Sequence, residues 1–517
     1  MNIVSLLPLL SQLVIKKSPP SSIFYIPVAI HYLFSCNRNN TFVPRWQLLP
    51  TYLAYLIKAS FNSNYVSILF GLIGVACDTI ISLPAISHIK GQYSVSHLDY
   101  EQLNTLSGYP AIGRIFYPSN TTHTIHSNYL FQQNRHGLTS RFIETSGIWE
   151  YFPQIPSWIL GHWSEIQIPS SMGSQPLRNS NDVSSPSQLP VIVFSHGNTA
   201  SREISTSMAL SLVSSGKAVV VLVEHTDGSS SLARYNDGTS LEFDHSVSAL
   251  GSKEETPAFL QARRQQSKIR SLNISDAINI LDQMNAGHPD IHQSILNCNV
   301  ETIQQFKGLL KLNNIGLGGH SFGGATVLNY ASDYMNQRIQ GNASKVSIGG
   351  LFVMDPANAW VPDEARLDVG LGTNSGFEHY WKMADISGDT PKLVTAMPVM
   401  FMYSESWHKV DKWSKFGKDL TTSSIYPNSE YVVVKGAGHQ CLCDVAVLLP
   451  HVLNEKLLKN TLKGTQSKDL PPIVNQVTLN WLRNVKVLNG ENRDIADVFG
   501  VMGNIQPNVK RKTKSHL

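Results

Sequence analysis

The residues best suited to chemistry lie in the segment NIGLGGHSFGGATVL, residues 314–328. A short apolar run leads into the pentapeptide GHSFG around Ser321, and a helix-forming stretch follows it. This order is typical of a nucleophile elbow, a sharp strand-to-helix turn that presents a serine hydroxyl. Glycine at 319 and 323 removes side chains that would collide in so tight a turn. We therefore predict Ser321 as a nucleophile for acyl transfer, with Gly319 and Gly323 as the elbow glycines. The alternative is a glycine-rich turn that only packs closely.

A serine hydroxyl is a weak nucleophile at neutral pH, so it needs a base within hydrogen-bond reach and a third group that orients the base. Behind an elbow of this kind, the acid and then the histidine follow the serine along the chain. Asp355 directly follows the apolar run GLFVM, so its carboxylate is expected at the carboxyl end of a sheet, where open α/β sheets bind ligands. His439 lies in the turn GAGHQ, just after the run YVVVK. We predict Asp355 as the acid and His439 as the base.

Other acids and histidines downstream of Ser321 fit these roles less well. The competing acids follow predicted strands less closely, and the competing histidines have aromatic, polar or helical surroundings that are typical of surface or core positions. The competitors are Asp385, Asp389 and Asp411 for the acid, and His379, His408 and His451 for the base. His320 immediately precedes the nucleophile and is expected to point away from it.

A second turn could supply hydrogen bonds to the reacting carbonyl oxygen. The apolar run VIVFSH ends in Gly197-Asn198-Thr199, where the backbone turns and can offer an amide to an oxyanion. The helix that follows Ser321 directs its first N–H groups and its positive end toward the same place. We predict the N–H groups of Asn198 and Phe322 as the oxyanion donors. The alternative for Asn198 is a plain strand-ending turn.

These residues need a sheet that brings them to one edge. Short β-branched runs alternate with helical periods from about Tyr109 onward, a pattern typical of a parallel sheet covered by helices. The class is therefore α/β. The polar, Ser/Gly-rich segment 227–258 is expected to form a long excursion over the sheet, in the manner of a lid. Strands are predicted over residues 190–196, 218–224, 315–319, 350–354, 399–403 and 431–435, and helices over 202–215 and 263–284.

The composition excludes several classes of protein. The chain has 517 residues, of which 42% are apolar and 15% are charged, and its Gly and Pro residues show no period. This excludes collagen, coiled coil and a wholly disordered chain. The net charge of +4 is too small to indicate a nucleic-acid partner. Five cysteines without paired CxxC spacing indicate neither a zinc ribbon nor a disulfide scaffold, and the roles of Cys441 and Cys443 beside His439 stay open.

The N-terminal region differs from the rest of the chain. Residues 1–90 carry six Lys or Arg residues and one acid, Asp78. The stretch Tyr65–Ile86 is long enough at helical rise to cross a bilayer of about 30 Å, although Asp78 and Pro84 interrupt it. Two interpretations stay open: a membrane helix, and an amphipathic helical extension that packs on the main domain.

Three regions are expected along the chain. They are an apolar, helical N-terminal region over residues 1–100, a catalytic domain over residues 101–490, and a C-terminal tail over residues 491–517. Four glycosylation-type triplets leave a secretory route open, and one of them falls in a predicted helix. The triplets begin at Asn39, Asn120, Asn273 and Asn342.

At these residues the chain resembles the platelet-activating factor acetylhydrolases of the plasma and type II kind, serine-dependent phospholipases A2 with the α/β-hydrolase fold. The matching segments are PVIVFSHGNTASR, VVLVEHTDGSS, GHSFGGAT, VMFMYSESW and KGAGHQCLCD, and the resemblance spans residues 109–488. Asn198 stands where the family usually has Leu, and DPANAW is longer than the family's DAW stretch. These departures bear on the acyl-chain preference more than on the catalytic residues.

The resemblance implies the same nucleophile, acid and base, Ser321, Asp355 and His439. It implies calcium-independent hydrolysis of a short or oxidised acyl chain at the sn-2 position of phospholipids, as by a 1-alkyl-2-acetylglycerophosphocholine esterase. A phospholipid at a membrane or lipid surface is the expected partner, and no metal, cofactor or nucleic acid is expected. The alternatives are a general carboxylesterase or lipase of the same superfamily and a non-catalytic, membrane-tethered scaffold.

Overall fold

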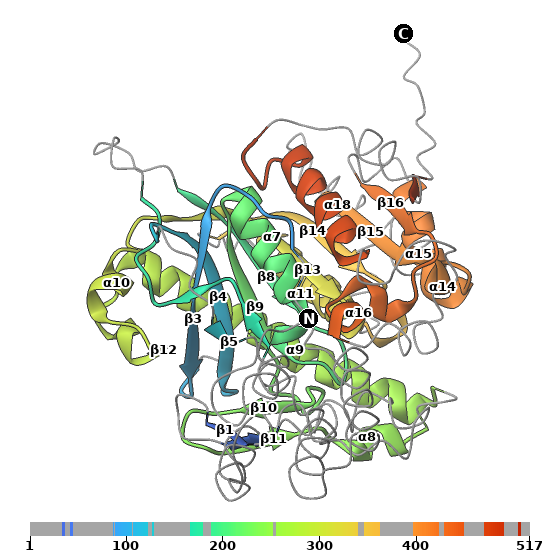
Figure 1. Ribbon diagram of the computed structural model, residues 1–517. Coiled ribbons are helices and arrows are strands. Elements are labelled where there is room, and N and C mark those ends of the chain that lie inside the picture. The colour runs from blue at the N-terminus through green and yellow to red at the C-terminus, as the bar shows by residue number, and fades with distance from the viewer. Residues whose placement is uncertain are drawn as a thin grey trace, which may run out of the picture.

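A single large sheet organises the described part of the chain (Figure 1). The computed structural model describes residues 34–36, 42–44, 86, 88–105, 107–121, 127–128, 166–178, 188–251, 255–339, 346–361, 397–422, 429–448, 470–490 and 505–507. The strand order across the sheet is β12 (Ile295–Leu296), β3 (Ser94–Gln102), β4 (Ala111–Ser119), β9 (Val219–Glu224), β8 (Leu189–Ser195), β13 (Leu310–His320), β14 (Ile348–Met354), β15 (Val399–Ser404), β16 (Glu430–Val434) and β17 (Ile505–Pro507). The short strand β7 (Ser171–Met172) pairs with β3.

The strands from β9 to β16 are parallel to their neighbours, whereas β12, β3, β4 and β17 join antiparallel at the two edges. Because parallel neighbours end at the same edge, the turns after β8, β13, β14 and β16 lie along one side of the sheet. These turns carry the predicted site residues.

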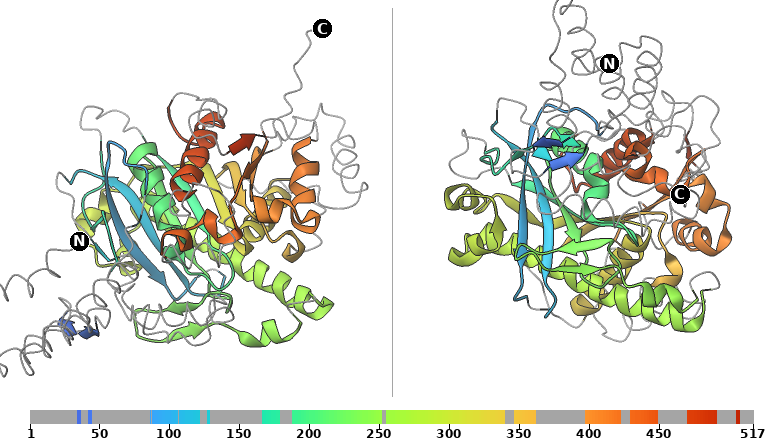
Figure 2. Two further views of the ribbon diagram at one scale, coloured as in Figure 1. Left: turned by 45° about the vertical axis from the view of Figure 1, so that its right-hand side comes forward. Right: turned by 60° about the horizontal axis from the view of Figure 1, so that its bottom comes forward.

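Helices cover both faces of the sheet (Figure 2). Alternate residues of β8 show the two layers, because side chains along a strand point to opposite faces. Ile192 and Phe194 pack with α7 (Thr206–Gly216) and α18 (Leu470–Asn484). Val191 and Val193 pack with α9 (Pro257–Ala286) and α11 (Phe322–Ile339). With a sharp strand–turn–helix at Ser321, this is the α/β-hydrolase fold, and the predicted class is confirmed.

Two differences from the expected domain boundaries stand out. Strand β3 begins at Ser94, before the expected start of the catalytic domain at residue 101, and it pairs along its whole length with β4. Strand β17 lies inside the expected tail 491–517 and pairs with β16. The main sheet therefore includes residues from both flanking regions.

The segment 227–258 contains secondary structure of its own. It contains an antiparallel hairpin, β10 (Leu232–Arg234) and β11 (Ser240–Glu242), followed by the short helix α8 (His245–Ala249). Residues 229–233 at its start are buried, so this end is packed into the domain. The expectation of a lid over the sheet stays a prediction.

The predicted membrane helix, Tyr65–Ile86, lies outside the described residues except for Ile86, which is buried. The described pieces nearer the N-terminus are β1 (Phe34–Cys36) and β2 (Phe42–Pro44), which pair antiparallel. Among all the described residues, no helix combines the length and apolar character needed to cross a membrane. The helical character of the N-terminal region stays a prediction.

One glycosylation-type triplet is closed to modification in the folded chain. Asn273 lies on α9 with 1% of its surface exposed. Its Nδ2 donates to Thr226 Oγ1 at 3.0 Å, and its Oδ1 accepts from the Thr226 amide at 3.2 Å. Asn120, by contrast, is exposed after β4. The triplets at Asn39 and Asn342 lie outside the described residues.

Candidate active site

Ser321 lies in a turn between the end of β13 and the start of α11. Its φ of 57° falls in the left-handed region, which a residue with a side chain rarely adopts. Two backbone hydrogen bonds hold this conformation: the Ser321 amide donates to the Met354 carbonyl at 2.8 Å, and its carbonyl accepts from the Ala357 amide at 3.0 Å. The sequence pattern therefore predicted the turn that the structure contains.

The elbow glycines are required by close backbone contacts. A Cβ on Gly319 would overlap the carbonyl group of Gly323, the second residue of α11. A Cβ on Gly323 would overlap the carbonyl oxygen of Ser195, at the end of β8. The helix therefore approaches the sheet more closely than any side chain at these two positions allows.

Asp355 is buried at the end of β14, also with a positive φ, of 42°. Ser404, at the end of β15, donates from its amide to Asp355 Oδ1 at 2.7 Å and from its hydroxyl to Oδ2 at 2.5 Å. Burial raises the pKa of Asp355, and these hydrogen bonds oppose the rise. The carboxylate is thus fixed in place by the neighbouring strand.

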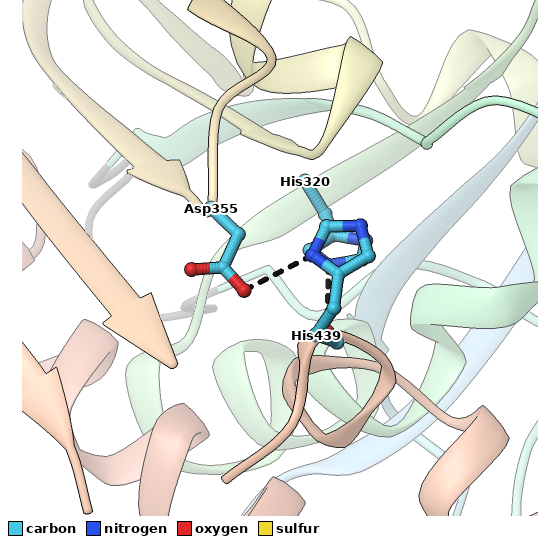
Figure 3. Close-up of side chains that lie close together, drawn as sticks. All are labelled: His320, Asp355 and His439. Carbon is cyan, nitrogen blue, oxygen red and sulfur yellow. Dashed lines mark hydrogen bonds and ion pairs between the residues drawn. The ribbon is translucent and has the colours of Figure 1, made fainter. Parts of the chain in front are cut away.

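His439 follows the turn after β16 and starts the short 3₁₀ helix His439–Leu442. Its Nδ1 donates to Asp355 Oδ2 at 3.0 Å (Figure 3). This bond fixes the tautomer, because the proton on Nδ1 leaves Nε2 as the lone-pair nitrogen. Burial lowers the pKa of His439, which keeps the ring neutral and able to accept a proton. The side chain keeps 21% of its surface exposed.

The predicted hydrogen-bonded chain from Ser321 through His439 to Asp355 is only half formed. The acid–base half is present, but in the described part of the chain no hydrogen bond joins the Ser321 hydroxyl to the His439 ring. Such bonds are often long in a free enzyme and shorten when substrate binds. The roles of the three residues stay a proposal, taken up below.

The proposed oxyanion donors belong to two turns beside Ser321. Gly197, just before Asn198, approaches so closely that a Cβ there would lie 3.1 Å from Ser321 Cβ. The amide of Phe322 is the first of α11, where the helix has free N–H groups. Neither the Asn198 amide nor the Phe322 amide has a hydrogen-bond acceptor among the described residues. Both are available to an oxyanion.

Comparison with known proteins shows the family of the chain. A family model described as platelet-activating factor acetylhydrolase, isoform II, matches residues 81–343 and 383–504. The chain belongs to this family. Membership places the chain among the carboxylic ester hydrolases.

Named relatives carry the same description. A platelet-activating factor acetylhydrolase of Canis lupus familiaris is 31% identical over 47% of this chain, and the alignment covers only about half of that relative, 51%. One of Cavia porcellus is 28% identical over 76% of each chain. A solved structure, a ferulic acid esterase from Streptomyces cinnamoneus, aligns with a TM-score of 0.45 and 14% identity over 81% of this chain and 95% of its own.

In this acetylhydrolase-family chain, two residues that the sequence analysis did not assign lie against the proposed base. The Trp407 ring stacks on one face of His439, with centroids 4.1 Å apart and planes 7° apart. His320 lies near the other face, with centroids 4.6 Å apart, and its Nε2 donates to the His439 carbonyl at 3.1 Å (Figure 3). His320 therefore contacts the proposed base, and the expectation that it points away from the nucleophile stays a prediction. The sequence signal that could have identified Trp407 is its position three residues after Ser404, where β15 ends.

The rival residues fall into two groups. His408 lies on α14 (Glu405–His408) and its Nδ1 shares a hydrogen bond with the Tyr431 hydroxyl at 2.9 Å, whereas the imidazole hydrogen-bonded to Asp355 is that of His439. Asp411 starts α15 (Asp411–Thr422) and its side chain is not among those described. The remaining rivals, Asp385, Asp389, His379 and His451, lie outside the described residues.

His320, Asp355 and His439 also bring three potential metal ligands within 4.8 Å of one another. The centroids of the two imidazole rings lie 4.6 Å apart, and the ring planes are tilted by 30°. A metal ion needs the in-plane lone pair of each ring. His439 Nδ1 already donates to Asp355, and His320 Nε2 already donates to the His439 carbonyl. The arrangement favours an acid–base pair over a metal centre.

Proposed function

We propose that this chain is a serine esterase that hydrolyses the sn-2 acyl ester of phospholipids through an acyl-enzyme on Ser321. The observation that carries the proposal is a serine at positive φ between β13 and α11, beside a buried Asp355 that accepts a hydrogen bond from His439. Membership of the acetylhydrolase family supports phospholipid as the substrate class.

In the first step, the Ser321 Oγ attacks the sn-2 carbonyl carbon and the hydroxyl proton moves to His439 Nε2. The carbonyl π electrons move to the oxygen, which accepts hydrogen bonds from the Asn198 and Phe322 amides. When the tetrahedral intermediate collapses, the imidazolium returns the proton to the leaving lysophospholipid oxygen. Water then attacks the acyl-enzyme carbonyl and gives a proton to His439 Nε2. When this second tetrahedral intermediate collapses, the proton returns to Ser321 Oγ and the carboxylic acid leaves. Asp355 stabilises the imidazolium in both halves of the reaction.

Two finer features belong to the proposal. Hydrolysis is independent of calcium, because serine, histidine and backbone amides supply every proton transfer and charge stabilisation that the steps need. The preferred chain at sn-2 is short or oxidised, as the family's name suggests for acetyl. We further propose that the enzyme works on lipid surfaces, for which the basic, apolar composition of residues 1–90 is the support.

The deciding experiment compares a phospholipid carrying an sn-2 acetyl group with its long-chain analogue, in EDTA. Wild type is compared with Ser321→Ala and with Ser240→Ala, a control that removes an exposed serine on β11. We expect acetyl-selective turnover by wild type and by Ser240→Ala, and a loss of at least about 10³-fold in Ser321→Ala.

Other outcomes point elsewhere. Turnover of simple esters alone would indicate a general carboxylesterase instead of a phospholipase. Preference for the long-chain phospholipid would indicate a lipase-like enzyme. If no ester is turned over in a Ser321-dependent way, a non-catalytic scaffold is the better account. Sedimentation with anionic vesicles tests the lipid-surface proposal separately. The experiment is repeated in 0.5 M salt, where the Debye length is roughly 4 Å and attraction between exposed charges is screened.

A further inference from the structure

The guanidinium of Arg270 contacts residues next to or within both turns that carry the proposed oxyanion donors. Arg270 projects from α9 and is completely buried. Its Nη2 donates to the carbonyl oxygen of His196, which is two residues before Asn198. Its Cζ lies 4.4 Å from the centroid of the Phe322 ring. One side chain therefore touches both the end of β8 and the first residue of α11.

Further hydrogen bonds tighten this connection. Arg270 Nε donates to Thr326 Oγ1 at 2.9 Å, and that hydroxyl donates to the Phe322 carbonyl at 2.9 Å. Nη1 donates to Ser229 Oγ at 2.5 Å, and the carbonyl oxygen of Ser229 accepts from the Thr199 amide at 2.8 Å. Arg270 thus holds α11 on one side and the Gly197–Thr199 turn, through Ser229 and His196, on the other.

The charge of Arg270 has neutral hydrogen-bond partners. They are carbonyl and hydroxyl oxygens, and the ion pairs found in the described part of the chain join other residues. The nearby carboxylate of Glu224 pairs with His196 at 2.8 Å, and that of Asp227 accepts from Ser229. Burial lowers the pKa of Arg270 to about 10, so it stays protonated at neutral pH. A buried, protonated cation without a bonded carboxylate exerts a strong local field.

We propose that Arg270 is a positioning residue for the oxyanion hole, one that fixes the Asn198 and Phe322 amides relative to each other and favours negative charge at the reacting oxygen. The inference rests on the proposed function. Hydrogen bonds and a positive field at the reacting oxygen become stronger as negative charge develops on it, so they stabilise the tetrahedral intermediate more than the bound ester. Arg270 does not touch the substrate and acts through the two turns.

Arg263 provides a matched control on the same helix. It is also buried, and its Cζ lies 5.8 Å from the Phe322 ring centroid and nearer to the rings of Phe259 and Trp360, at 5.1 and 4.9 Å. Its Nη1 donates to Gln266 on α9 itself, at 2.7 Å. Removing Arg263 therefore deletes a buried arginine and its longer ring contact with Phe322, but none of the described hydrogen bonds to β8 or α11.

The test compares Arg270→Met, Arg270→Lys and Arg263→Met with wild type. The readouts are kcat/KM on an acetyl ester and inhibition by an alkyl trifluoromethyl ketone and by its methyl ketone. Ser321 Oγ adds to the trifluoromethyl ketone carbon, the hydroxyl proton passes to His439, and the carbonyl electron pair becomes an oxyanion. The methyl ketone binds without forming a stable adduct, so it reports ground-state binding.

We expect Arg270→Met to lower kcat/KM by about 10- to 100-fold and to weaken trifluoromethyl ketone inhibition by the same factor, with methyl ketone inhibition unchanged. Arg270→Lys should lose less, and Arg263→Met only a few-fold. Equal weakening of both ketones, or no weakening of either in a folded Arg270→Met, would overturn the proposal. A wild type without ester turnover would instead refute the proposed function.

Should Arg270→Met fail to fold, Thr326→Val and Ser229→Ala decide the question, because each removes one Arg270 acceptor and leaves the charge in place. Circular dichroism and the melting temperature establish that these variants are folded. Selective weakening of the trifluoromethyl ketone in either variant supports the proposal. Wild-type values for both ketones in both variants contradict it.

Discussion

At the scale of single residues, His439 is held on three sides. Asp355 fixes one edge of the ring through Nδ1, and Trp407 and His320 lie against its two faces. The described contacts of the ring thus leave its Nε2 edge as the one that can accept the Ser321 proton. A base confined in this way loses little entropy when substrate binds.

We expect Trp407→Ala to lower kcat by about 10- to 100-fold, because the ring of His439 then has freedom to leave its productive orientation. Trp407→Phe keeps an aromatic face and should retain most of the activity. Steady-state kinetics on one ester measures both. Trp413→Ala is the control, since Trp413 stacks on Trp407 at 4.8 Å, whereas the described ring contacts of His439 are with Trp407 and His320. Wild-type kcat in Trp407→Ala would contradict the confining role.

The two cysteines after His439 should be unreactive in the folded chain. Burial raises the pKa of Cys441 to about 11 and raises the pKa of Cys443 further. A raised pKa leaves the thiols protonated at pH 8, and only the thiolate reacts quickly with iodoacetamide. Mass spectrometry of peptides should show slow alkylation of both in native protein, and rapid alkylation in urea. Half-buried Cys298 is the internal control, and modification of Cys441 before Cys298 would refute this prediction.

At the scale of elements, the contact between α11 and β8 sets how far the nucleophile stands from the oxyanion turn. Gly323→Ala places a methyl group on the Ser195 carbonyl oxygen, so α11 must move away from the sheet. We expect a loss of about 3 kcal/mol in unfolding free energy, measured by urea denaturation, together with lost activity.

Gly308→Ala serves as the control for Gly323→Ala. Gly308 has a φ of 71° but no heavy atom within 4 Å of a Cβ built on it. Only the backbone strain of a left-handed alanine is then added, about 1 kcal/mol. Equal losses in the two variants would show that close contact with β8 contributes nothing.

The sequence predicted those elements whose own residues decide their conformation. Strand β9 is a buried run of mainly β-branched residues, VVVLVE, and its assignment needed no other part of the chain. Strand β3 was missed because it buries polar side chains. Its Asp99 is paired with Arg114 of β4 at 2.8 Å, and its His97 is bonded to Ser170 at 2.9 Å. Such pairings exist only once the sheet has formed.

The candidate site divides in the same way. Ser321, Asp355 and His439 each lie at or shortly after the end of an apolar run, so local sequence placed them at one edge of a sheet. Trp407 was not assigned, because its stacking on His439 depends on the relative positions of β15 and β16, which no single segment encodes. Arg270 was not assigned for the same reason, since its partners come from three other elements.

At the scale of the whole molecule, the last strand of the sheet comes from close to the C-terminus. A chain ending after residue 504 lacks β17 and leaves β16 with an unpaired edge. We expect a lower melting temperature and more aggregation for this truncation than for one ending after residue 507, which keeps the strand. Thermal melts and light scattering measure both. Equal behaviour of the two truncations would show that the β16–β17 pairing adds no stability.

The burial of Asn273 has a consequence for how the chain must mature. An oligosaccharide on its Nδ2 could not fit within α9, where this nitrogen donates to Thr226. If the chain is made on membrane-bound ribosomes, folding of α9 competes in time with the glycosyltransferase at the triplet NIS. Every copy that loses this race is excluded from the native state, so the yield of active enzyme depends on the speed with which one helix docks.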